Sequence, residues 1–433
     1  MSSGSVDQHR QLLNAELHAR PFMTLAPPAR LWHHALLLEG DGLQASIEAL
    51  RTLYERHDMS MPAVDGNQLL ETFPEFRLRW ERHAEFVTIT FILEQGFDPP
   101  FGSEPVLQRL QHWIRMFPGE RVLAVTMSVW PADAPGFEES DLTRHFETSS
   151  LCGAICRRAD ARIWTDFRIH PDGYERIAVK DCSGDERRLG ALVQRLLELS
   201  DYRALALLGL PTARRLEPKL REVGDRLYHQ VSRIHGDSNL DSDHALLEEL
   251  IALSAEMEDI GAASAFRFSA TSAYRALVKS RLASLQEEPL RELETLDAFL
   301  SRRFDPAMRT IDSVSMRQER LARRIARAAS LLSTRVECAM ERQSRMLLSS
   351  MARHARMQLR LQQTVEGLSL AAIAYYVVGL VGYVSKPVAD RFFAGGLSLV
   401  QALSVPVVVL VCWHMLRRRR RSVEQDDAGH DSG

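Results

Sequence analysis

The sequence predicts an α+β domain, followed by an all-α stalk with a long coiled-coil-like helix and a two-helix C-terminal transmembrane hairpin. Strand-like runs of β-branched and aromatic residues occur between residues 31 and 183, and purely helical patterns follow them. Two uncharged apolar segments lie near the C-terminus. We therefore divide the chain into an arm (1–30), an α+β domain (31–183), a helical domain (184–305), a basic stalk helix (306–363), a hairpin (364–416) and a tail (417–433).

The overall composition excludes several classes of protein. The 433 residues carry a net charge of -3, so nucleic acid is not an expected partner. The five cysteines form no CxxC pair, which favours reduced cytosolic thiols over a disulfide framework. The N-terminus has no basic-then-apolar signal pattern, so the hairpin would have to direct the chain to the membrane.

The N-terminal arm contains three polar residues that alternate along the chain, Glu16, His18 and Arg20. An extended arm would place all three on one side. They form either a ligand-binding cluster or the contacts that attach the arm to its own domain. Pro27 and Pro28 end the arm, because proline resists both helix and central strand.

Strands are predicted in the α+β domain where bulky apolar residues are concentrated, and helices where apolar residues recur at three and four spacing. The predicted strands are 31–39, 85–93, 121–130, 161–170 and 174–180, and the predicted helices are 42–57 and 105–117. The turn at 171–173 joins two of these strands. This order predicts a sheet with helices on one face.

Asp166, Arg168 and His170 alternate along one predicted strand and would share a face. They form either a ligand site or the solvated face of an edge strand. The chain contains no dinucleotide, P-loop, zinc-protease or nucleophile-elbow motif. We therefore expect neither an enzyme nor a cofactor.

The helical domain is predicted to contain helices at 187–210, 240–259, 264–288 and 290–304. The second carries seven acids and neither lysine nor arginine. Glu249, Glu256 and Asp259 are its candidate ligands for a divalent cation, because hard cations bind clustered oxygens. A solvated acidic face is the alternative.

The stalk helix is predicted to begin in the turn that contains Pro306. An apolar seam follows it at alternating three and four spacing: Leu321, Ile325, Ala328, Leu332, Val336, Ala339, Leu347 and Met351. Such a seam must be covered by partner copies or by the preceding helices, and the first case predicts self-association through the stalk. Residues 302–360 contain 14 arginines, no lysine and five acids.

Two segments, 368–384 and 397–416, are long and apolar enough to cross a bilayer as helices. Eight basic residues flank them on the outer sides, in 353–360 and in 417–421, whereas the connecting loop has two. The positive-inside rule therefore predicts a two-pass protein of the bacterial inner membrane with both termini cytoplasmic. Arg353, Arg356, Arg360 and Arg417 to Arg421 would contact anionic lipid head groups.

The chain resembles an uncharacterised family of bacterial membrane-anchored proteins nearly end to end. The stretches that carry this resemblance are LNAELHARPF (13–22), DFRIHPDGY (166–174), RFSATSAYRALVKSRL (267–282), FDPAMRT (304–310) and LRLQQTVEGLS (359–369). Its architecture also resembles the CorA-type magnesium channels, which are homopentamers whose first span lines the pore and ends in Gly-Met-Asn. Here Gly379-Leu-Val-Gly382-Tyr383 stands at that place, without the motif.

Two functions fit these observations. As a membrane-anchored, homo-oligomeric sensor or scaffold, the protein would use the hairpin only as an anchor. As a CorA-like divalent-cation channel, it would line a pore with Tyr375, Gly379 and Gly382. The two glycines would let neighbouring helices approach closely. If the glycines do not line a pore, they pack the hairpin against itself.

Overall fold

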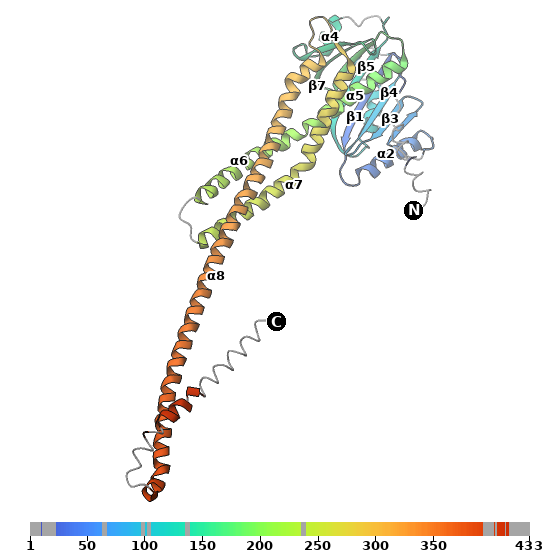
Figure 1. Cartoon of the computed structure of the whole chain (residues 1–433). Coiled ribbons are helices and arrows are strands. Elements are labelled where there is room, and N and C mark those ends of the chain that lie inside the picture. The colour runs from blue at the N-terminus through green and yellow to red at the C-terminus, as the bar shows by residue number, and fades with distance from the viewer. Residues whose placement is uncertain are drawn as a thin grey trace. The chain divides into compact units, whose positions relative to one another are not determined.

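The computed structural model describes residue 10 and residues 23–62, 67–96, 100–101, 105–134, 139–234, 240–392, 402, 405–411 and 413–414. The chain divides into two compact units, Met1–Leu331 and Leu332–Gly433. The first unit contains a mixed α/β sheet domain, and a long helix continues toward the C-terminus (Figure 1).

A single mixed sheet organises the first unit. Its nine described strands have the order β2-β3-β4-β1-β5-β8-β7-β6-β9. The strands are β1 (Ala29–Leu37), β2 (Gln68–Thr72), β3 (Arg77–Arg82), β4 (Phe86–Leu93), β5 (Glu120–Trp130), β6 (Cys152–Cys156), β7 (Ala161–Ile169), β8 (Glu175–Asp181) and β9 (Glu287–Pro289). Neighbours pair antiparallel except β5 and β8, which pair parallel. The parallel pair requires a crossover, and this crossover brings Tyr174 beside β5.

Helices cover both faces of the sheet. The helices of the first unit are α2 (Gly42–Arg56), α3 (Pro105–Ile114), α4 (Glu139–His145), α5 (Glu186–Leu207), α6 (Gly209–Ile234) and α7 (Leu240–Leu285), and α8 runs over Leu296–Phe392. Trp32 and Leu36 of β1 belong to the core that α2 and α3 cover. The intervening His33 points the other way and bonds Asp201 of α5. The prediction of helices on one face only was wrong, because α5 covers the second face.

Most of the elements with a strong local pattern are confirmed. The predicted strands 31–39, 85–93, 121–130, 161–170 and 174–180 correspond to β1, β4, β5, β7 and β8. The predicted helices 42–57, 105–117 and 187–210 correspond to α2, α3 and α5. Helix α5 begins where Asp185 accepts bonds from the backbone N–H groups of Arg187 and Arg188.

Several helix boundaries were predicted wrongly. The two expected helices 240–259 and 264–288 form the single helix α7, because Gly261 is tolerated inside it. Helix α6 was not predicted, and Pro211 lies in its first turn rather than ending the preceding helix. Pro306 lies inside α8, which begins at Leu296 and continues to Phe392, beyond the expected end at Val384.

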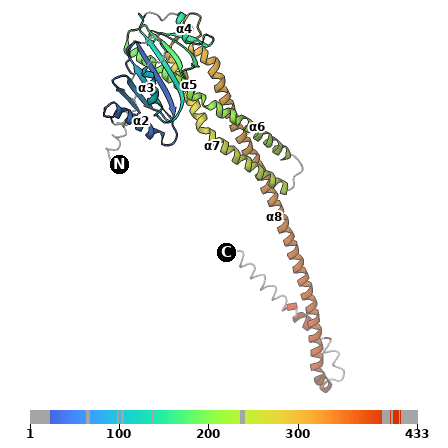
Figure 2. The same cartoon turned by 180° about the vertical axis from the view of Figure 1, so that it is seen from behind.

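The predicted seam of α8 is divided. Its first five positions, Leu321, Ile325, Ala328, Leu332 and Val336, are buried within the single chain. In the first unit, Ser264 of α7 donates to Gln318 of α8, so the preceding helices cover the seam positions that belong to this unit, Leu321, Ile325 and Ala328. Leu347 and Met351, farther along, are exposed. Figure 2 shows α6 and α7 running next to each other, as their contacts require.

Among the described residues, one helix is long and apolar enough to cross a membrane, judged by its length and composition. It is the part of α8 from Leu296 to Val384, and 6% of its most apolar window is buried. Half of the second apolar segment, 397–416, lies outside the described residues, and its residues 405–411 are helical.

Candidate functional site

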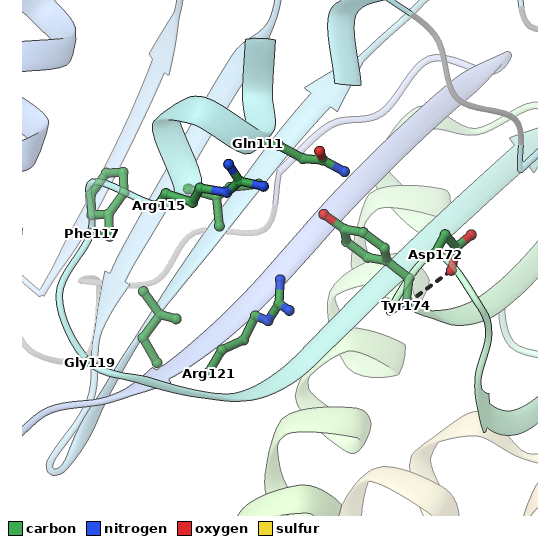
Figure 3. A pocket seen from close by; sticks show the side chains of 9 residues that line it. Gln111, Arg115, Phe117, Gly119, Arg121, Asp172 and Tyr174 are labelled. Carbon is green, nitrogen blue, oxygen red and sulfur yellow. Dashed lines mark hydrogen bonds between the residues drawn. The ribbon is translucent and has the colours of Figure 1, made fainter. Parts of the chain in front are cut away.

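A cavity of about 400 Å³ opens on the face of the sheet that α2 and α3 cover. Four parts of the first unit line it: strand β1, the end of α3 with the turn that follows it, the start of β5, and the turn before β8 (Figure 3). The lining residues are Leu36, Gln111, Ile114, Arg115, Phe117, Gly119, Arg121, Asp172 and Tyr174. We call this cavity the arginine pocket.

A tight turn places the two arginines of the pocket. Helix α3 ends at Ile114, and β5 begins at Glu120. Between them Gly119 adopts a φ of +112°, and a Cβ at this position would lie 2.5 Å from the carbonyl oxygen of Leu37. Only glycine fits this close approach without strain. The turn therefore brings Arg115 and Arg121 to the same cavity, and their side chains point into it in Figure 3.

The floor of the pocket is polar and neutral. Burial raises the pKa of Tyr174 to about 12, so its hydroxyl stays protonated. Its hydroxyl oxygen lies 3.5 Å from Nε2 of His34, a residue that is fully buried. Burial lowers the pKa of His34, and the nearby His33 and Arg121 lower it further, so the ring is neutral. The Nδ1 atom of His34 has no hydrogen-bond partner among the described residues.

The one carboxylate of the arginine pocket is already occupied. Asp172 accepts a bond from Arg176 at 2.9 Å and another from the backbone N–H of Tyr174 at 3.0 Å. Neither Arg115 nor Arg121 forms an ion pair with a described residue. The pocket therefore has an excess of positive charge, together with an amide from Gln111 and a phenol from Tyr174 as neutral donors.

The structure brings together two of the three candidate residues at the end of β7. His170 Nε2 lies 3.0 Å from an oxygen of Asp166, which also accepts from the backbone N–H groups of Glu147 and Arg168. Phe167 adopts a φ of +51°, and the pairing of β7 with β8 shifts between Thr165 and Ile169. Because of this irregularity the strict alternation is lost, and Asp166 is buried where it organises the local backbone.

Arg168 turns to a second cavity of about 300 Å³, between the end of β7 and the first turns of α8. Its Nε donates to Ser150 at 3.0 Å. Arg203, which also lines this cavity, is neutralised by Glu175 at 2.5 Å and lies over the ring of Phe167. Arg303 lies over the ring of Phe299. Charges are therefore better balanced here than in the arginine pocket.

The acidic candidates on α7 lie beside α6. Arg233 pairs with Glu249 at 3.4 Å, and Arg226 pairs with Glu256 at 2.7 Å. Asp259 lies one turn farther along α7. No group of three or more histidine, cysteine, aspartate or glutamate side chains that could hold a metal ion occurs among the described residues.

The remaining candidates lie near the two ends of the chain. Tyr375, Gly379 and Gly382 are in α8, where Tyr375 is 78% exposed and a Cβ added at Gly379 would meet nothing within 4 Å. Arg353, Arg356 and Arg360 are exposed on the same helix. Glu16, His18, Arg20 and the run Arg417 to Arg421 lie outside the described residues.

The arginine pocket itself was not predicted from the sequence. Arg115 follows the end of α3 and Arg121 lies in β5, and Tyr174 comes beside them only through the parallel pairing of β5 and β8. The Pro118-Gly119 dipeptide between a helical pattern and a strand-like run was the available signal for a tight turn.

The family model described as "Protein of unknown function (DUF3422)" matches residues 6–423. No curated protein matches the chain.

Proposed function

The chain belongs to DUF3422, a family of unknown function, and we propose that it is a membrane-anchored, homo-oligomeric sensor or scaffold whose sheet domain binds a ligand. In this proposal the apolar end of α8 lies in the bilayer. The sheet domain remains in the cytoplasm and presents the arginine pocket.

The exposure of the apolar end of α8 carries the proposal. Residues 368–384 contain no charge, and their large side chains face outward, with Tyr383 84% exposed. Soluble monomers rarely expose continuous apolar surface of this extent. At ~1.5 Å per residue the segment spans about 26 Å, close to the thickness of a hydrocarbon core. A bilayer removes this surface from water.

The two-pass topology extends the proposal. The described part of the second apolar segment is helical, and Val407, Val409 and Leu410 are exposed within it. Eight basic residues on the outer sides against two in the connecting segment favour cytoplasmic termini. The arginines in 353–360 and 417–421 would then face anionic head groups of the inner membrane.

Self-association is proposed for the exposed part of the seam. Beyond Val336, the seam residues Leu347 and Met351 are more than half exposed, and so is Met340, which is next to the seam residue Ala339. Helices of this length hide such residues by pairing with another helix. A second copy of α8 would provide an identical surface.

Reporter fusions test the topology. A reporter fused at Met1 and one fused after Gly433 should both give cytoplasmic signals. A periplasmic signal from either fusion would contradict the two-pass anchor.

A divalent-cation channel is the second candidate, and the surroundings of Gly379 favour it. No side chain of a described residue requires glycine there, because an added Cβ would meet nothing within 4 Å. Close approach between copies is a remaining use for it. Liposomes that contain the protein and a divalent-sensitive dye separate the two functions. Entry of magnesium, cobalt, nickel or zinc would support the channel, and no entry at any gradient would leave the anchored sensor.

A further inference from the structure

The arginine pocket combines unpaired positive charge with a half-open cavity. Arg115 and Arg121 approach it from the end of α3 and the start of β5, and no carboxylate of a described residue neutralises either. At about 400 Å³ the cavity is within the usual range for small-molecule sites. Two guanidinium groups that line one cavity repel each other, so an anion between them would relieve this repulsion.

The other donors converge on the same space. Figure 3 shows the Gln111 amide and the Tyr174 hydroxyl on the side of the cavity opposite the two guanidinium groups. The ring of His34 can form its one bond to Tyr174 through Nε2. A proton on Nε2 leaves only the Nδ1 lone pair unpaired, which is less unfavourable than an orphaned N–H. In this tautomer the Tyr174 hydroxyl accepts from His34, and its hydrogen is free to bond a ligand.

The apolar part of the wall indicates the rest of the ligand. Leu36, Ile114 and Phe117 line the cavity and are at most 7% exposed, so they offer an uncharged body a small apolar surface. Arginine forks match the oxygens of a phosphoryl group, and four donors that line one cavity suit a tetrahedral dianion better than two separated carboxylates. Asp172, held by Arg176, would reject a second negative group on that side.

We propose that the arginine pocket binds a small phosphomonoester, with its phosphoryl oxygens between Arg115 and Arg121 and its uncharged body against Leu36 and Phe117. This inference rests on the sensor part of the proposed function and names the class of ligand. The phosphoryl group could come from a soluble metabolite or from a phosphatidate head group, and these sources share the same chemistry.

Calorimetric titration of the detergent-purified full chain tests this inference, with phenyl phosphate as the probe. We expect saturable binding, weaker binding of inorganic phosphate because it lacks the apolar body, and weaker binding of succinate and benzoate. Dihexanoyl phosphatidate tests the lipid source. If it binds more tightly than phenyl phosphate, the ligand is a lipid head group, and if it binds more weakly, the ligand is a soluble ester. The absence of saturable phenyl phosphate binding, or tighter binding of succinate, would overturn the inference.

Matched variants locate the site. Loss of one charge-assisted fork should weaken phenyl phosphate binding about 10- to 100-fold in Arg115→Gln and in Arg121→Gln. Both side chains are exposed at the rim of the pocket, so the melting temperatures of these two variants should equal that of the wild type. Arg162→Gln, an exposed arginine of the same sheet outside the pocket, should bind as the wild type does. Equal affinities of the wild type and all three variants for phenyl phosphate would show that it does not bind in the arginine pocket. Recovery of the protein in the membrane fraction tests the membrane anchor separately. Failure of the anchor and failure of phosphomonoester binding can therefore be distinguished.

Discussion

The guanidinium of Arg267 donates to both carboxylate oxygens of Glu85, at 3.1 and 2.7 Å. Glu85 directly precedes β4, and Arg267 lies in the middle of α7. Their side chains are 9% and 18% exposed, so this bidentate pair is shielded from solvent. Tyr274 lies beside the pair, and burial, followed by contact with Glu85, raises its pKa. The pair attaches the helical segment to the sheet domain within the first unit.

Arg267→Lys should destabilise this attachment. Lysine keeps the charge but cannot form the two parallel bonds, and one oxygen of Glu85 would lose its donor. We expect a loss of about 1–2 kcal/mol in the free energy of unfolding, seen as a lower melting temperature. Arg221→Lys is the control, because Arg221 pairs with Glu217 at the exposed surface of α6. An equal shift in both variants would show that the buried pair has no special role.

Gly119→Ala should disturb the arginine pocket through the turn that positions Arg121. The new methyl group would meet the Leu37 carbonyl oxygen, and the φ of +112° is strained for alanine. We expect a loss of about 1–3 kcal/mol in stability together with weaker phenyl phosphate binding, because Arg121 follows the turn. Gly96→Ala is the matched control, since an added Cβ there meets nothing within 4 Å. A Gly119 variant with wild-type stability would contradict this description of the turn.

Glu287 makes stability depend on pH. Burial raises its pKa from 4.5 to about 7, although the backbone N–H of Asp297 donates to it at 3.1 Å. The folded protein therefore retains a proton that the unfolded chain releases near pH 4.5. The contribution of Glu287 is fully present below pH 4.5 and is lost as pH rises through about 7.

Differential scanning calorimetry of Glu287→Gln measures this contribution. The wild type should lose stability between pH 5 and pH 8, by up to about 3 kcal/mol from this group, and the variant should lose less. Glu292→Gln, at an exposed position in the same segment, should keep the wild-type slope. Parallel curves for the wild type and Glu287→Gln would disprove the assignment.

The two halves of the α8 seam should respond differently to a charge. Ile325 is 0% exposed and Leu347 is 59% exposed. Ile325→Asp should unfold the first unit, because a buried carboxylate has no partner there. Leu347→Asp should leave the melting temperature unchanged and reduce the subunit number measured by mass in mild detergent. A monomeric wild type at micromolar concentration would contradict self-association through this surface.

Local patterns predicted the elements whose signals are strong. The runs of β-branched and aromatic residues in β1, β4 and β5 predicted these strands, and the three and four spacing of apolar residues predicted α2 and α5. β3 was missed because its sequence, RLRWER, alternates arginine and glutamate with apolar residues, and its Arg79 and Glu81 are buried as an ion pair at 2.9 Å. From the sequence alone, charged side chains such as these are expected to be exposed to solvent.

Nonlocal contacts explain the other differences. α8 continues through Pro306 because the buried side chains of Phe304 and Met308 hold the helix on either side of it. The arginine pocket depends on the β5–β8 parallel pairing, which local patterns do not specify. The alternation of Asp166, Arg168 and His170 was visible, but the positive φ of Phe167 separates Arg168 from the other two.

Extraction of the full chain from membranes with alkaline carbonate tests the central claim most directly, that the apolar end of α8 lies in the bilayer. We expect the wild type to stay in the membrane pellet. Ile373→Arg combined with Leu380→Arg should release or degrade the protein, since each arginine costs about 2.5–3.5 kcal/mol in the hydrocarbon core. Leu361→Arg, exposed before the apolar segment, should stay in the pellet. Recovery of the folded wild type in the carbonate supernatant would contradict the membrane anchor.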